Sequence, residues 1–83
     1  MDVSEEVKAV LAQVLRLGDA VRQFDESTAL FGAIAEFDSM AVVTVITTLE
    51  ERFDILIEDD EVTADVFETV GSLTRFIRGK LAA

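Results

Sequence analysis

The residue of this chain that could carry a chemical group is Ser39, which lies between Asp38 and Met40 at the junction of an irregular stretch and a periodic apolar run. The run over residues 39–53 predicts a helix, with Asp38 as its N-cap and Ser39 in its first turn. The first N–H groups of a helix lack partners within it, and with the helix dipole they stabilise a phosphate. Ser39 is therefore a candidate for carrying a phosphate-linked group. Because serine is ordinary at helix starts, a purely capping role is the alternative.

The helix over residues 39–53 is predicted from apolar residues at helical spacing, which are Val42, Val45, Ile46, Leu49 and Phe53. β-branched residues run together over 42–48, and that run taken alone also fits a β-strand. No second strand-like segment is present to pair with it, which favours the helix.

A first helix is predicted from the apolar spacing of residues 3–14, beginning after Asp2 or Ser4 and ending at Gly18. The stretch 18–38 has no clear period. We expect an ordered loop there, with room for one short helical turn. Its apolar side chains would pack it onto the helices, and these are Val21, Phe24, Leu30, Phe31, Ile34 and Phe37.

An acidic extended stretch is predicted over residues 54–61, followed by a short third helix that starts at Thr63 or Asp65 and includes Phe67. The last helix starts near Thr69, and basic residues occupy its final turns, where the helix dipole favours cations. The predicted fold class is all-α. It is a four-helix bundle in a single domain, with a short third helix and a long loop between helices one and two.

Composition excludes several classes of protein. The 83 residues hold 17 Asp and Glu against 7 Lys and Arg, a formal charge of −10, with no His and no Cys. Nucleic-acid binding depends on basic residues, so it is excluded. Without imidazole or thiol groups there is no zinc finger and most self-contained enzyme mechanisms are excluded, so we expect no enzyme. The acidic run over residues 58–61 lacks the alternating ligands and central glycine of an EF-hand loop, so we expect weak, nonspecific cation binding and no metal site there. No signal peptide and no apolar run of about 20 residues is present, so we expect a cytoplasmic monomer without a membrane span.

The excess charge is confined to one part of the chain. Residues 36–68 hold eleven acidic residues against Arg52 alone, a net charge of −10, whereas the remaining residues sum to zero. A charge run is usually a solvated face. Its concentration in one third of the chain favours a docking surface for partners with basic patches, which the charge would steer.

Four segments resemble, in order and spacing, the acyl carrier protein family. They are Leu30-Phe31-Gly32, Phe37-Asp38-Ser39-Met40, Leu49-Glu50-Glu51-Arg52-Phe53-Asp54-Ile55 and Phe67-Glu68-Thr69-Val70-Gly71-Ser72-Leu73. The resemblance implies a single acyl-carrier-like domain over residues 1–83. It also implies that Ser39, flanked by Asp38 and Met40, receives 4′-phosphopantetheine from coenzyme A through a phosphopantetheinyl transferase. The thiol of that group would hold acyl groups as thioesters.

The resemblance further implies that the second helix docks enzymes that load and accept acyl groups. The implied partner-binding residues are Met40, Val43, Thr47, Glu50 and Glu51. Acids expected early on this face are replaced here by Ala41, Thr44 and Thr47. The departure suggests a specialised carrier, in a lipid, polyketide or polysaccharide-associated pathway. A peptidyl or aminoacyl carrier and an unmodified acidic protein-interaction module are the alternatives.

Overall fold

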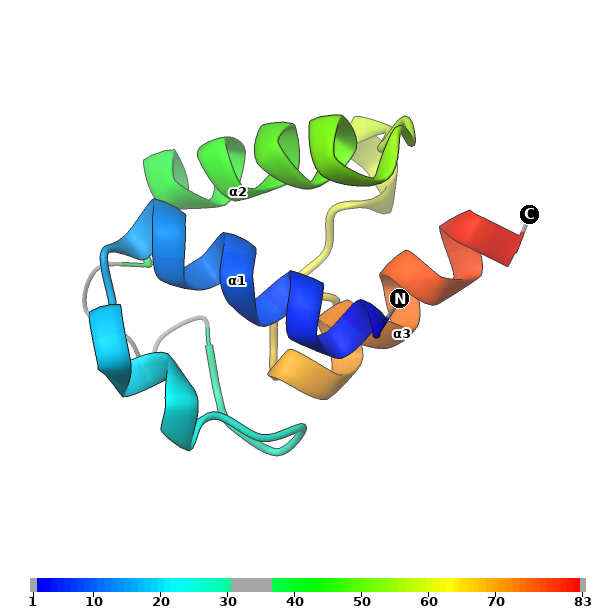
Figure 1. The fold of residues 1–83 in the computed structure, drawn as a ribbon. Coiled ribbons are helices and arrows are strands. Elements are labelled where there is room, and N and C mark those ends of the chain that lie inside the picture. The colour runs from blue at the N-terminus through cyan, green and yellow to red at the C-terminus, as the bar shows by residue number, and fades with distance from the viewer. Residues whose placement is uncertain (1, 31–36, 83) are drawn as a thin grey trace.

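A computed structural model describes residues 2–30 and 37–82, which fold into three α-helices and two short 3-10 helices (Figure 1). The elements are α1 (Val3–Leu15), η1 (Gly18–Gln23), α2 (Ser39–Phe53), η2 (Asp59–Glu61) and α3 (Val70–Ala82). The α1 helix lies between α2 and α3 and contacts both. The all-α bundle predicted from the sequence is confirmed. None of the described helices is long and apolar enough to cross a bilayer.

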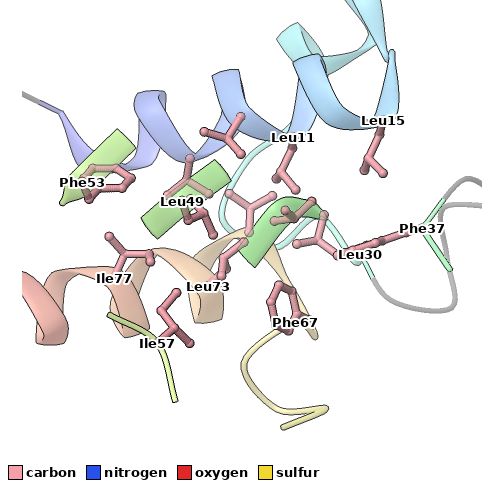
Figure 2. Close-up of a cluster of buried hydrophobic side chains, with 14 residues drawn as sticks. Leu11, Leu15, Leu30, Phe37, Leu49, Phe53, Ile57, Phe67, Leu73 and Ile77 are labelled. Atoms are coloured by element: carbon pink, nitrogen blue, oxygen red, sulfur yellow. The ribbon is translucent and has the colours of Figure 1, made fainter. Parts of the chain in front are cut away.

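The hydrophobic core lies where the three α-helices meet, and loop residues complete it (Figure 2). The helices contribute Val7, Val10, Leu11, Leu15, Val45, Leu49, Phe53, Val70, Leu73 and Ile77, and the loops contribute Leu30, Phe37, Ile57 and Phe67. Phe24 and Phe76 pack partly buried against this cluster. Other residues of the sequence argument lie outside the described part of the chain, namely Phe31, Gly32, Ile34 and Glu36.

The α1 helix ends three residues before the predicted position at Gly18. Arg16 adopts the left-handed conformation, with φ of 56°, which stops the helix. The backbone N–H groups of Arg16 and Leu17 both donate to the carbonyl of Ala12 and so close the last turn. The chain then enters η1, which supplies a short helical turn within the predicted loop.

The second part of the predicted loop is fastened to the start of α3. Backbone hydrogen bonds of 2.9–3.0 Å join residues 26–30 to residues 68–71, and Ala29 forms an antiparallel bridge within this contact. One of these bonds runs from the N–H of Gly71 to the carbonyl oxygen of Glu26, at 2.9 Å. A Cβ atom at Gly71 would lie 2.8 Å from the same oxygen. The close approach of the two backbones therefore requires a glycine.

The short third helix was predicted in the wrong place. The helical turn lies at η2, whereas residues 64–67 form hydrogen-bonded turns. Acidic side chains explain the shift, because Glu61 Oε1 accepts the N–H of Glu58 at 2.9 Å and so caps η2. Beyond the turns, Thr69 and Ser72 exchange side-chain to backbone hydrogen bonds of 3.0 and 3.1 Å, and α3 begins there.

Thr74 is a buried polar residue whose replacement should stabilise the fold. It is 1% exposed, and its hydroxyl has no hydrogen-bond partner among the described residues. Thr74→Val keeps the shape and removes an unpaired hydroxyl, so we expect the free energy of unfolding to rise by about 1 kcal/mol. Urea denaturation measures the change. Thr69→Val, which removes the cap of α3, should instead lose about 1 kcal/mol. An equal or lower stability of Thr74→Val would contradict the prediction.

Glu61 joins η2 to α3 and should make stability depend on pH. Its carboxylate oxygens lie 2.8 and 3.1 Å from Lys80 Nζ. The hydrogen bond from Lys80, followed by that from the Glu58 backbone, lowers the pKa of Glu61. A carboxyl group whose pKa is lower in the folded than in the unfolded state stabilises the fold. This stabilisation is fully present above the unfolded-state pKa and is lost as the pH falls through the folded-state pKa.

In Glu61→Gln, the free energy of unfolding should therefore fall less steeply than in the wild type as the pH is lowered. Chemical denaturation between about pH 3 and 7 tests this expectation. Lys80→Met should remove only the part of this component that comes from Lys80, since the N–H of Glu58 still donates to Glu61. The double variant should lose no more of it than Glu61→Gln alone. Curves for the wild type and for Glu61→Gln that remain parallel down to the acid limit would refute the assignment.

Candidate functional site

The α2 helix carries the candidate site, and its β-branched run includes threonines whose hydroxyls bond within the helix. The hydroxyls of Thr44, Thr47 and Thr48 each donate to the carbonyl four residues earlier, at 2.8–3.1 Å. Their polar groups are thus satisfied along the helix itself. Buried side chains on the opposite face recur every four residues, at Val45, Leu49 and Phe53. The predicted helix over residues 39–53 is confirmed.

The start of α2 is fixed by an aromatic contact and an N-cap. Phe37 is buried, and its ring meets that of Phe67 edge to face, with centroids 5.7 Å apart. Asp38 follows in an extended conformation, and its Oδ1 accepts the N–H of Ala41 at 2.9 Å. This is the geometry of an N-cap, so Ser39 is the first residue of the helix. Core packing thus determines where the Ser39 hydroxyl emerges.

Ser39 is exposed, and its surroundings suit an attached phosphate. Within the described ranges, the backbone N–H groups of Ser39 and Met40 have no hydrogen-bond partner. These two donors and the positive end of the helix dipole favour a negatively charged group at this point. The sequence contains no His or Cys, the side chains that most readily act as a base or a nucleophile near neutral pH.

The predicted partner-binding residues all lie on α2, but they differ in their surroundings. Met40 is 73% exposed and Val43 is 58% exposed, and Thr47 and Glu51 are also at the surface. Glu50 is only half-exposed.

The contact of Glu50 is one that sequence reasoning missed. Its Oε2 accepts the backbone N–H of Ile57 at 2.8 Å. The carboxylate therefore holds the chain that leaves α2. Sequence reasoning also missed Leu56, which is 67% exposed between Ile55 and Ile57. The alternation of Ile55 and Ile57 around Leu56 was the available signal for its exposure.

Comparison with known proteins gives consistent matches over nearly the whole chain. The family model described as the phosphopantetheine attachment site matches residues 5–77. An acyl carrier protein of Sulfurovum sp. (strain NBC37-1) is 36% identical over 78 residues, which is 93% of this chain and 96% of that protein. An acyl carrier protein of Desulforapulum autotrophicum is 35% identical over 80 residues, covering 96% and 99%.

A solved structure is also similar. The solution NMR structure of a holo acyl carrier protein from Nitrosomonas europaea superposes with a TM-score of 0.93 at 48% sequence identity. The match covers 100% of both chains. The likeness therefore extends to the fold as a whole.

Proposed function

Because this chain belongs to the acyl carrier protein family, we propose that the Ser39 hydroxyl is the attachment point of its 4′-phosphopantetheine group. The family consists of carriers rather than catalysts, and 4′-phosphopantetheine is its prosthetic group. The observation that supports Ser39 is its exposed position as the first residue of α2, next to two N–H groups that have no hydrogen-bond partner among the residues the structure describes. The group supplies a thiol that carries acyl groups as thioesters.

The residues around Ser39 have separate tasks in this proposal. When Ser39 Oγ forms its bond to the phosphorus next to the pantetheine of coenzyme A, the pyrophosphate P–O bond breaks and 3′,5′-adenosine bisphosphate leaves. The proton of the Ser39 hydroxyl passes to a base of the phosphopantetheinyl transferase. The N–H groups of Ser39 and Met40 then face the attached phosphate and stabilise its charge. Asp38 keeps these donors in place, because its carboxylate engages the N–H of Ala41 instead. The carrier thus orients the Ser39 hydroxyl and binds the attached phosphate, and the partner enzyme catalyses the transfer.

The type of carrier and the contacts with its partners are proposed from the surface of α2. We propose a specialised acyl carrier, because Ala41, Thr44 and Thr47 leave the first half of this surface without acids. Enzymes that load and accept acyl groups would meet Met40, Val43 and Thr47 through apolar contacts, and would meet Glu50 and Glu51 through basic patches. A lipid, polyketide or polysaccharide-associated pathway stays a prediction, as do the monomeric state and the cytoplasmic location.

Loading of the purified apo-protein tests the proposal. The protein is incubated with coenzyme A and a phosphopantetheinyl transferase, and its intact mass is measured. We expect the wild type to gain one phosphopantetheine group and Ser39→Ala to gain none. Ser27→Ala is the matched control, because Ser27 is an exposed serine whose hydroxyl bonds to Asp25 Oδ1 at 2.7 Å, and this variant should be modified. A mass gain by Ser39→Ala, or none by the wild type, would refute the assignment.

A further inference from the structure

Exposed large apolar side chains gather on α2 and at its exit. Within residues 2–30 and 37–82, four such side chains are exposed: Met40 at 73%, Val43 at 58%, Leu56 at 67% and Leu81 at 39%. Met40 and Val43 lie in the first half of α2, beside Ser39. Leu56 follows the last residue of the helix by three positions. The apolar contact area is thus placed at both ends of one helix.

The chain around Leu56 is held in a fixed conformation. Asp54 takes the left-handed conformation with φ of 55°, and the N–H of Ile55 donates to the carbonyl of Glu50 at 3.1 Å. The Glu50 carboxylate then receives the N–H of Ile57 at 2.8 Å. Ile57 is buried in the core cluster (Figure 2) and Ile55 packs partly buried against it. Because both flanking side chains turn inward, Leu56 is directed outward before any partner binds.

The chain on either side of Leu56 is acidic, in contrast to the Ser39 end of the helix. Glu51, Asp54 and Glu58 are exposed, and in the described structure none of them forms an ion pair with a basic residue. Residues 39–49 contain no charged side chain at all. The surface along α2 is therefore apolar and neutral beside Ser39. At the exit from the helix it consists of an exposed leucine among the exposed acidic residues Glu51, Asp54 and Glu58, which we call the acidic rim.

We propose that Leu56 is a docking anchor for the enzymes that act at Ser39, an inference that rests on the proposed function. A buried apolar side chain within a polar rim is the usual arrangement of an energetic centre in a protein interface. The acidic rim determines the partner's chemistry, which is an apolar pocket bordered by lysine or arginine. Glu50 acts as a positioning residue, because it holds the loop that presents Leu56.

The distance between the two ends suits one interface. The 15 residues of α2 span roughly 22 Å at 1.5 Å per residue. A standard interface covers about 800 Å² on each partner, which is roughly 30 Å across. One enzyme can therefore cover Leu56 while its active-site entrance lies over Ser39.

Kinetics of Ser39 modification test this inference, with the phosphopantetheinyl transferase of the source organism and coenzyme A as the probe. We expect Leu56→Glu and the neutral Leu56→Asn each to raise KM for the carrier about tenfold, with kcat near the wild-type value. Leu56→Met, which stays apolar, should recover most of the affinity. Wild-type KM should also rise between about 50 and 300 mM salt, because salt screens the attraction between the acidic rim and the lysine or arginine residues of the partner.

Leu81→Glu is the matched control, since it introduces the same charge at an exposed leucine of α3 and should leave KM unchanged. Circular dichroism and a melting curve show that each variant is folded. If the wild type is modified and the KM of each Leu56 variant stays within twofold of the wild-type KM, this inference is wrong and the proposed function still stands. A KM that does not change with salt would refute the claim that lysine or arginine borders the partner's pocket. A wild type that is not modified would overturn the proposed function and this inference with it.

Discussion

Gly71→Ala is expected to lower the free energy of unfolding by about 1–3 kcal/mol, as overpacking of a tight contact does. The new Cβ would lie 2.8 Å from the carbonyl oxygen of Glu26, and a backbone oxygen has no rotamer by which to move away. The hydrogen bond from Gly71 N–H to that oxygen would lengthen as well. Because this contact fastens residues 26–30 to α3, we expect those residues to lose amide protection first.

Gly79→Ala provides the control on the same helix. Among the described residues, no atom beyond the neighbouring residues and the helix's own backbone lies within 4 Å of a Cβ built at Gly79, so the substitution meets no obstacle. Alanine in a helix is more stable than glycine by about 0.5–1 kcal/mol, and Gly79→Ala should gain an amount of that order. Urea denaturation of both variants measures the difference. If Gly71→Ala were as stable as Gly79→Ala, the close backbone approach would be wrong.

Phe67→Ala is expected to cost about 3–5 kcal/mol, the range for truncating a buried phenylalanine. Phe67 is 3% exposed, and its edge-to-face contact with Phe37 would be lost with the ring. Total stabilities of small domains are about 5–15 kcal/mol, so this loss is a large fraction. Phe37 precedes the Asp38 cap directly. We therefore expect the first turn of α2 to exchange its amide hydrogens faster, and Ser39 to lose its fixed position.

Two variants separate this effect from general loss of packing. Phe67→Leu keeps an apolar side chain there and should lose clearly less than Phe67→Ala. Phe76→Ala removes a ring of the same size from a half-buried position of α3. It should destabilise the fold without selective exposure of the α2 amides. Equal hydrogen exchange at the start of α2 in Phe67→Ala and Phe76→Ala would contradict the link between Phe67 and Ser39.

Local features of the chain were enough to predict the element that carries the candidate site. The apolar spacing after Asp38 determined the helix, and its first residue is where an aspartate cap predicts it. The exposure of Met40 and Val43 follows from the same spacing, since both lie off the apolar face. These signals are contained within a few residues of each other, which is why sequence alone supplied them.

Features that depend on distant residues could not be predicted in this way. The α1 helix stops at Arg16, which adopts a left-handed conformation that nothing in its residue type demands. The η2 helix lies before the predicted third helix, where Lys80 from α3 holds Glu61. Glu50 was assigned only to partner binding, yet it also receives the N–H of Ile57. The contacts of Glu61 and Glu50 join separate parts of the chain and depend on tertiary packing, which outweighs local propensity.

The most direct test of the central claim is fragmentation mass spectrometry of this protein isolated from its own host. Fragmentation along the backbone locates a covalent group on a single residue. We predict that fragments containing Ser39 carry the mass of phosphopantetheine, with or without an acyl group on its thiol, and that fragments ending before Ser39 do not. A phosphopantetheine located on any other residue, or a host protein with an unmodified Ser39 throughout, would contradict the assignment.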